Sequence, residues 1–194
     1  MTSARPMRRL ACLTIGGLLL AGSWPVNARA RAGRPHAPTV DGDRTNALVD
    51  VVRQSTDRFH DVAVAEAEGY KLMFGCVSGS DTGAMGLHYV NLPLVLDGEL
   101  DATRPEIVLY EPLANGHLRL VGADYLVFAA DWDKKQVGPP QVMGQLLHLF
   151  ESPNRFGLPT FYTLHVWAWK DNPSGAFVNW HSNVSCDAFD GQDL

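Results

Sequence analysis

Seven histidines occur in the sequence, and three of them, His88, His117 and His165, lie on or beside segments that we expect to be β-strands. Divalent transition metals often bind imidazole, and two imidazoles with one carboxylate form a recurring ligand set for such ions. If His88 and His165 come from neighbouring strands, Glu111 at the end of a third strand would complete this set. The pattern predicts a divalent metal site of His88, His165 and Glu111, in a metal-binding protein or a metal-dependent enzyme.

A structural interpretation of the same histidines stays open. None of them belongs to a ligand-spaced motif such as His-x-His or His-Glu-x-x-His. His165 would then be a core histidine bonded to the backbone, and His88 a residue that caps the end of its strand. The position of the ring nitrogens distinguishes the two interpretations, because metal ligands converge on one point.

Three tryptophans are candidates for ligand binding. Trp167 and Trp169 alternate with other residues on one strand, and Trp180 follows toward the C-terminus. An indole ring stacks well on the apolar face of a small ligand, although core packing is its commoner use. Our leading interpretation is a small-ligand binding module or a structural module, and the metal protein is the alternative. No motif in the sequence identifies a reaction.

Most of the elements that would position these side chains are strands. Runs rich in β-branched and aromatic residues predict strands over 87–92, 107–111, 118–129 and 160–170. Asn115-Gly116 predicts a hairpin between the second and third of them. The last strand is apolar on both faces, which predicts a central position in the sheet. The glycine-rich segment 75–86 is interpreted as an irregular loop.

Apolar residues at helical spacing predict two helices. One long amphipathic helix is expected over 45–67, and a shorter one from Met143 to Phe150. The predicted fold class is therefore α+β, with a mostly antiparallel sheet, one long N-terminal helix and a short second helix.

The N-terminal residues have the features of a secretory signal peptide. Basic residues precede an apolar run from Leu10 to Leu20, and Ala28-Arg29-Ala30 matches the pattern that signal peptidase cleaves. The run is far shorter than the roughly 20 residues that cross a bilayer. We predict a signal peptide over 1–30, a disordered leader over 31–44, a single domain over 45–190, and no membrane span after cleavage. The protein would be periplasmic or secreted.

Cleavage would leave Cys76 and Cys186 as the two remaining cysteines. In an oxidising compartment they should form a disulfide, and closing a loop of this length would stabilise the fold by about 4–5 kcal/mol in the chain-entropy model. A catalytic thiolate at Cys76, activated by a histidine, is the alternative.

Charge bears on the choice of partner. Cleavage would remove four of the 16 basic residues and none of the 21 acidic ones, which leaves a net charge of −9. Nucleic acids and anionic membranes are bound through clustered Lys and Arg, and the sequence shows no such cluster. We therefore expect a small molecule or a metal ion as the ligand.

Two sequence blocks resemble a family of uncharacterised exported bacterial proteins. The first is GAMGLHYVN (83–91) and the second is LHVWAWKDNPSG (164–175). The resemblance extends from the helix near Phe59 to Cys186. It implies export, but it carries no activity, ligand or catalytic residue that could be transferred.

Overall fold

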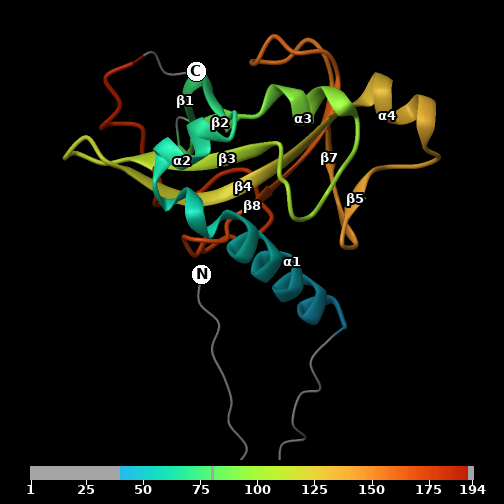
Figure 1. Cartoon of the computed structure of the whole chain (residues 1–194), viewed down its shortest axis with the longest axis horizontal. Coiled ribbons are helices and arrows are strands. Elements are labelled where there is room, and N and C mark those ends of the chain that lie inside the picture. The colour runs from blue at the N-terminus through green and yellow to red at the C-terminus, as the bar shows by residue number, and fades with distance from the viewer. Residues whose placement is uncertain (1–39, 80, 192–194) are drawn as a thin grey trace, which may run out of the picture. The chain divides into compact units, whose positions relative to one another are not determined.

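The computed structural model describes residues 40–79 and 81–191 (Figure 1). Along the chain the elements are α1 (Val40–Thr56), the 3₁₀-helix η1 (Asp57–His60), α2 (Val62–Ala67), β1 (Lys71–Gly79), β2 (Gly83–Val90), α3 (Leu92–Asp97), β3 (Ile107–Pro112), β4 (Leu118–Phe128), α4 (Ala129–Lys135), β5 (Gln141–Val142), β6 (Gln145–Leu146), β7 (His148–Phe150) and β8 (Phe161–Val166). The predicted signal peptide, 1–30, and most of the predicted leader lie outside the described residues.

The strands form a six-stranded antiparallel sheet in the order β1-β2-β3-β4-β8-β7, beside a two-stranded sheet of β5 and β6. The predicted α+β class with a mostly antiparallel sheet is confirmed. The four predicted strands correspond to β2, β3, β4 and β8, and the Asn115-Gly116 hairpin joins β3 to β4 as expected. The last prediction, 160–170, is too long, because β8 ends at Val166, so Trp167 and Trp169 follow the strand instead of lying on it. β8 lies between β4 and the short edge strand β7.

The prediction of one long helix over 45–67 is wrong, because the segment is divided into α1, η1 and α2. Asp61 has extended backbone angles, φ −94° and ψ 109°, and its side chain accepts a hydrogen bond from the Ala63 N–H. This cap starts a new helix at Val62. The apolar spacing continues across the break, so hydrophobic periodicity alone does not reveal it.

The predicted helix from Met143 to Phe150 is also wrong, since this segment forms β6, β7 and the turn before β6. Met143 and Gly144 have positive φ angles, 49° and 87°. Two successive residues with positive φ are typical of a tight hairpin turn and are incompatible with a right-handed helix.

The glycine-rich segment 75–86 is not an irregular loop, because β1 and β2 pair through it. Gly83 and Gly86 are needed where other backbone segments approach closely. A Cβ atom at Gly83 would lie 2.1 Å from the His181 carbonyl oxygen, and one at Gly86 would lie 2.4 Å from that of Tyr110. These glycines therefore permit backbone contacts inside a sheet.

Two apolar cores lie on opposite faces of the sheet. In Figure 1, α1 lies below the strands, and α2 and α3 lie above them. Alternate residues of β4 divide between the cores: Tyr125 and Val127 pack with Leu48 and Val52 of α1, whereas Leu126 belongs to the other core. The period of two is that of a strand buried on both faces.

Cys76 of β1 and Cys186 near the C-terminus lie at disulfide distance, as predicted, with their Cα atoms 5.7 Å apart. The link joins residues 110 positions apart in the sequence. The segment after β8 is thereby fastened against β1.

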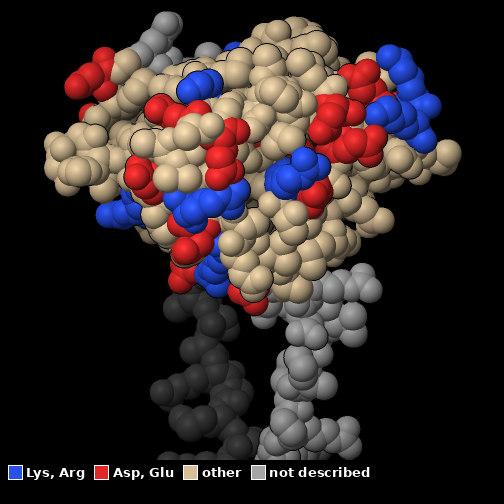
Figure 2. Space-filling view, viewed as in Figure 1, with Lys and Arg blue, Asp and Glu red and all other residues tan. Residues whose placement is uncertain are grey.

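Basic and acidic side chains lie side by side on the face drawn in Figure 2. Ion pairs among the described residues include Arg104 with Asp101 and Lys135 with Glu99. Within the described part of the chain, no helix has both the length and the apolar character needed to cross a bilayer.

Candidate metal centre

Strand pairing brings His88, Asp124 and His165 together on one face of the sheet. Asp124 of β4 lies opposite His165 of β8, and also opposite Ile107 of β3. His88 of β2 lies opposite Leu109, two residues from Ile107. Directly paired residues point to the same face of a sheet, as do residues two apart on a strand. Three strands far apart in sequence therefore contribute one polar side chain each to a common point.

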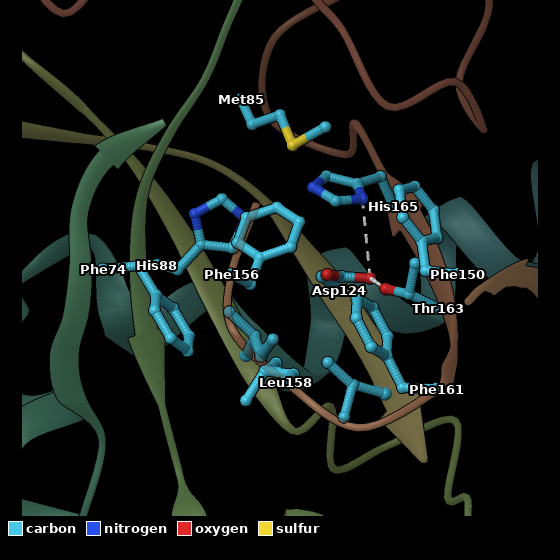
Figure 3. Close-up of a pocket in the computed structure, with 12 residues that line it drawn as sticks. Phe74, Met85, His88, Asp124, Phe150, Phe156, Leu158, Phe161, Thr163 and His165 are labelled. Carbon is cyan, nitrogen blue, oxygen red and sulfur yellow. Dashed lines mark hydrogen bonds and ion pairs between the residues drawn. The ribbon is translucent and has the colours of Figure 1, made fainter. Parts of the chain in front are cut away.

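The distances between these side chains suit ligands of one ion. One potential ligand atom from each residue lies within 4.8 Å of the others, and all three residues are buried. His165 Nδ1 is 3.6 Å from Asp124 Oδ1, and the two imidazole centroids are 5.6 Å apart (Figure 3). Two ligand atoms each about 2.1 Å from a tetrahedral ion lie roughly 3.4 Å apart. The observed separations reach 4.8 Å, so binding of an ion would draw the three side chains closer together.

Asp124 is held by its neighbours on β8. Its Oδ1 accepts hydrogen bonds from the Thr163 hydroxyl at 2.5 Å and from the Leu164 N–H at 3.1 Å. Burial raises the pKa of Asp124 to about 6, against the opposing effect of these hydrogen bonds. The hydrogen bonds fix the orientation of the carboxyl group, as outer hydrogen bonds fix the ligands of known metal sites.

One ring nitrogen of the buried His88 has a lone pair that could bind a metal ion. Its Nδ1 lies 3.1 Å from the Gly86 carbonyl oxygen, which can only accept, so Nδ1 carries the proton and donates. The other nitrogen, Nε2, is then the unprotonated one. Burial, together with the neighbouring His165, lowers the pKa of His88 to about 4. A neutral imidazole whose other nitrogen is bonded to a carbonyl is the usual form of a histidine ligand.

His165 has no hydrogen bond at either ring nitrogen among the described residues. Its side chain is 4% exposed, and the 3.6 Å separation from Asp124 is too long for a hydrogen bond. Burial lowers its pKa to about 3, so the ring is neutral. A buried polar group without a partner costs about 1–3 kcal/mol, and such groups are rare. The interpretation of His165 as a core histidine bonded to the backbone does not match this environment.

A cavity of about 30 Å³ adjoins the three side chains. Most of its remaining wall is apolar and comes from Phe74, Met85, Ile107, Leu126, Phe150, Phe156, Leu158 and Phe161. One water molecule needs about 10–15 Å³ by this kind of measure. The cavity, whose lining residues Figure 3 shows, thus has room for two or three molecules of that size.

Glu111 occupies a different environment. Its carboxylate accepts hydrogen bonds from the Lys170 ammonium group at 2.7 and 2.8 Å, and Arg119 lies 3.5 Å away. The carboxylate beside the two histidines is that of Asp124. Sequence reasoning missed Asp124, although one signal was present, because it is the one charged residue within the apolar run 120–130. His117, the third histidine near a strand, is exposed in the β3–β4 loop.

The three tryptophans have different surroundings. Trp167 is buried and its indole N–H donates to the Val178 carbonyl at 2.6 Å, while that of Trp169 donates to the Thr56 hydroxyl at 3.0 Å. Trp180 is half-buried and lines an open surface pocket of about 410 Å³. Trp167 also lines a surface pocket, of about 460 Å³, but it is almost fully buried, so Trp180 is the more accessible of the two.

Comparison with known proteins provides no relative for this geometry. No family model, no curated protein and no solved structure matches the chain. The resemblance to uncharacterised exported proteins stays a prediction. Both of its blocks contribute to the centre, since His88 lies in 83–91 and His165 in 164–175.

Proposed function

We propose that the protein binds a divalent first-row transition-metal ion through His88, Asp124 and His165. The observation that supports this most is His165, a buried imidazole with no hydrogen-bond partner beside a second imidazole and a carboxylate. Two nitrogen donors favour ions such as zinc, iron or copper, whereas calcium and magnesium prefer oxygen ligands.

The number of protein ligands favours a reactive centre over a structural one. Structural zinc sites are closed by four protein ligands, whereas catalytic sites have three and bind water or substrate at an open position. The cavity beside His88, Asp124 and His165 could receive that water. A metal ion there would lower the pKa of the bound water and polarise an oxygen atom of a substrate. We infer metal-assisted chemistry on a small molecule as the activity class.

Metal content of the protein purified without chelator tests the proposal. Near-stoichiometric metal is expected in the wild type and in His117→Ala, which removes an exposed histidine. His165→Ala and Asp124→Asn should both lose the metal. Glu111→Gln should keep it, because the Glu111 carboxylate is paired with Lys170. Wild-type protein that stays free of metal after incubation with zinc or iron(II) would overturn the proposal.

Binding of a small ligand at Trp180 is a second candidate function. Trp180 lines its surface pocket together with polar residues, among them Thr82, Asn179 and Ser182. An indole with polar neighbours suits a cyclic ligand that combines apolar and hydroxylated surface. Fluorescence titration with a panel of methyl glycosides should change the emission of the wild type and not of Trp180→Ala. Identical responses would exclude this function.

Export is also part of the proposal. It is supported by the N-terminal signal pattern and by the pairing of Cys76 with Cys186, which oxidising compartments favour. Mass spectrometry of the protein recovered from the periplasm or the medium should find a chain that begins at Arg31. Protein that stays in the cytoplasm with its N-terminus intact would contradict export.

A further inference from the structure

The cavity at the metal centre adjoins a second cavity of about 40 Å³. The two share Phe74, Ile107, Leu126 and Leu158 as wall residues. All nine residues that line the second cavity are apolar. The first cavity is also lined mostly by apolar side chains, but His88, Asp124, Thr163 and His165 line it as well, whereas no polar residue lines the second.

One wall residue of the second cavity, Leu92, lies at the start of α3 and is partly exposed. Leu92 lines it, yet 46% of the Leu92 residue surface is exposed. Leu96, one helical turn further along α3, is 61% exposed. Large exposed apolar side chains beside an apolar cavity are characteristic of a site that receives an apolar group from solution.

Phe74 is one of the four residues that line both cavities, and it is the one whose backbone has a positive φ. It lies in the bulge of β1 between Met73 and Cys76, and its φ of 69° is in the region that favours glycine. Its ring lines both cavities and makes an edge contact with Phe156, with the centroids 5.8 Å apart. Strained residues of this kind persist where the surrounding structure holds them, and they are concentrated at functional sites.

We propose that the two cavities bind a linear aliphatic molecule with a polar head, and that Phe74 controls how far its chain extends. This inference rests on the proposed function, since the head group would lie at the metal ion. The size of the cavities favours an unbranched chain, because neither has room for a fused ring system. Their chemistry agrees, since the polar groups gather at the end formed by His88, Asp124 and His165.

Isothermal titration of the metal-loaded protein with short carboxylates tests this inference. Hexanoate has four methylene groups more than acetate, and each buried methylene strengthens binding about fourfold. Hexanoate should therefore bind at least tenfold more tightly than acetate. Adamantane-1-carboxylate, which is bulky, should bind at least tenfold more weakly than hexanoate. Equal binding of acetate and hexanoate would overturn the inference.

Two substitutions at Phe74 test where the aliphatic chain of the ligand lies. Phe74→Trp should weaken hexanoate binding at least tenfold and leave acetate binding and metal content unchanged. Phe74→Gly suits the positive φ, so it should fold and should admit adamantane-1-carboxylate. Leu149→Ala, which changes an exposed leucine on β7, is the control and should behave as wild type. Unchanged carboxylate selectivity in both Phe74 variants would contradict the assignment.

Metal content measured on the same samples separates the two proposals. If the wild type holds metal but does not distinguish the carboxylates, the aliphatic ligand is wrong and the metal centre stands. If the wild type holds no metal, the proposed function is wrong, and with it the position of the head group.

Discussion

The two faces of strands β4 and β8 are buried to a similar degree but differ in chemistry. On the face covered by α1, Tyr125, Leu164 and Val166 belong to an apolar core. On the opposite face, the neighbouring residues Asp124 and His165 lie at the same depth. Since alternate residues of one strand supply both faces, the polar side chains are inserted into a segment that is otherwise suited to a core.

The comparison separates the side chains that stabilise the fold from those that do not. Apolar burial on the α1 face stabilises the protein by itself. On the other face, two neutral imidazoles and a carboxylate carry a desolvation cost, and His165 receives no hydrogen bond among the described residues in return. A metal ion bound at that point would supply the missing interaction, so we interpret the polar face as the functional one.

Loss of the disulfide should have the largest effect, and it should act through the face that contains the centre. Cys76 and Cys186 both belong to the apolar core on that side of the sheet. Replacing both with serine should lower the free energy of unfolding by about 4–5 kcal/mol, because the closed loop spans 110 positions. Urea titration measures the change, and a loss below about 1 kcal/mol would contradict this role.

Substitutions at two adjacent positions of β8 should differ in their effect on the free energy of unfolding. Leu164→Ala removes buried apolar volume from the α1 face and should cost about 3 kcal/mol. His165→Leu replaces an unpartnered polar ring by an apolar side chain of similar size. In metal-free protein it should therefore leave stability unchanged or raise it by about 1 kcal/mol. Thermal unfolding of both variants checks this, and a His165→Leu variant as damaged as Leu164→Ala would show a structural role for the ring.

Glu106 is a buried carboxyl residue that should make the stability of the protein depend on pH. Its buried carboxyl accepts a hydrogen bond from the Leu126 N–H, and burial raises its pKa to about 8. The unfolded chain releases this proton near pH 4.5 and the folded protein retains it until about pH 8, so stability falls as pH rises between these values. Glu106→Gln should therefore have a higher free energy of unfolding than wild type at pH 8. The gain should be small at pH 5, and equal gains at both would contradict the shift.

Thr163→Val should have the smallest effect, one confined to metal affinity. The Thr163 hydroxyl orients Asp124, and loss of such a partner typically weakens metal binding 10–100-fold. Tyr162→Phe changes the neighbouring residue on β8, whose side chain packs with the α1 core, and should leave affinity unchanged. Competition with a chelator of known affinity measures the metal affinity of both variants. Equal affinities would show that Thr163 does not contribute to metal binding.

Sequence patterns predicted the strands and the disulfide better than the helices. Alternating and apolar runs identified β3, β4 and β8 because burial on a sheet imposes a simple period. The break of the long helix at Asp61 depends on a side-chain cap, and the hairpin at Met143 depends on a turn conformation that methionine seldom adopts. Local backbone chemistry of this kind overrides hydrophobic spacing.

The candidate centre was predicted in part. His88 and His165 were identified as a pair because both are polar residues on predicted strands. Their carboxylate partner depends on which strand lies beside β8, and that neighbour is β4 with Asp124, not β3 with Glu111. The order of strands in a sheet is a long-range property that a single sequence pattern does not contain.

Anomalous X-ray diffraction from crystals of the protein grown with zinc or iron(II) tests the central claim most directly. Data collected on either side of the absorption edge of the metal locate the ion itself. We expect one strong peak about 2.0–2.2 Å from a ring nitrogen of His88, a ring nitrogen of His165 and a carboxylate oxygen of Asp124. No peak at that point, with His165 bonded instead to an ordered water molecule, would contradict the account.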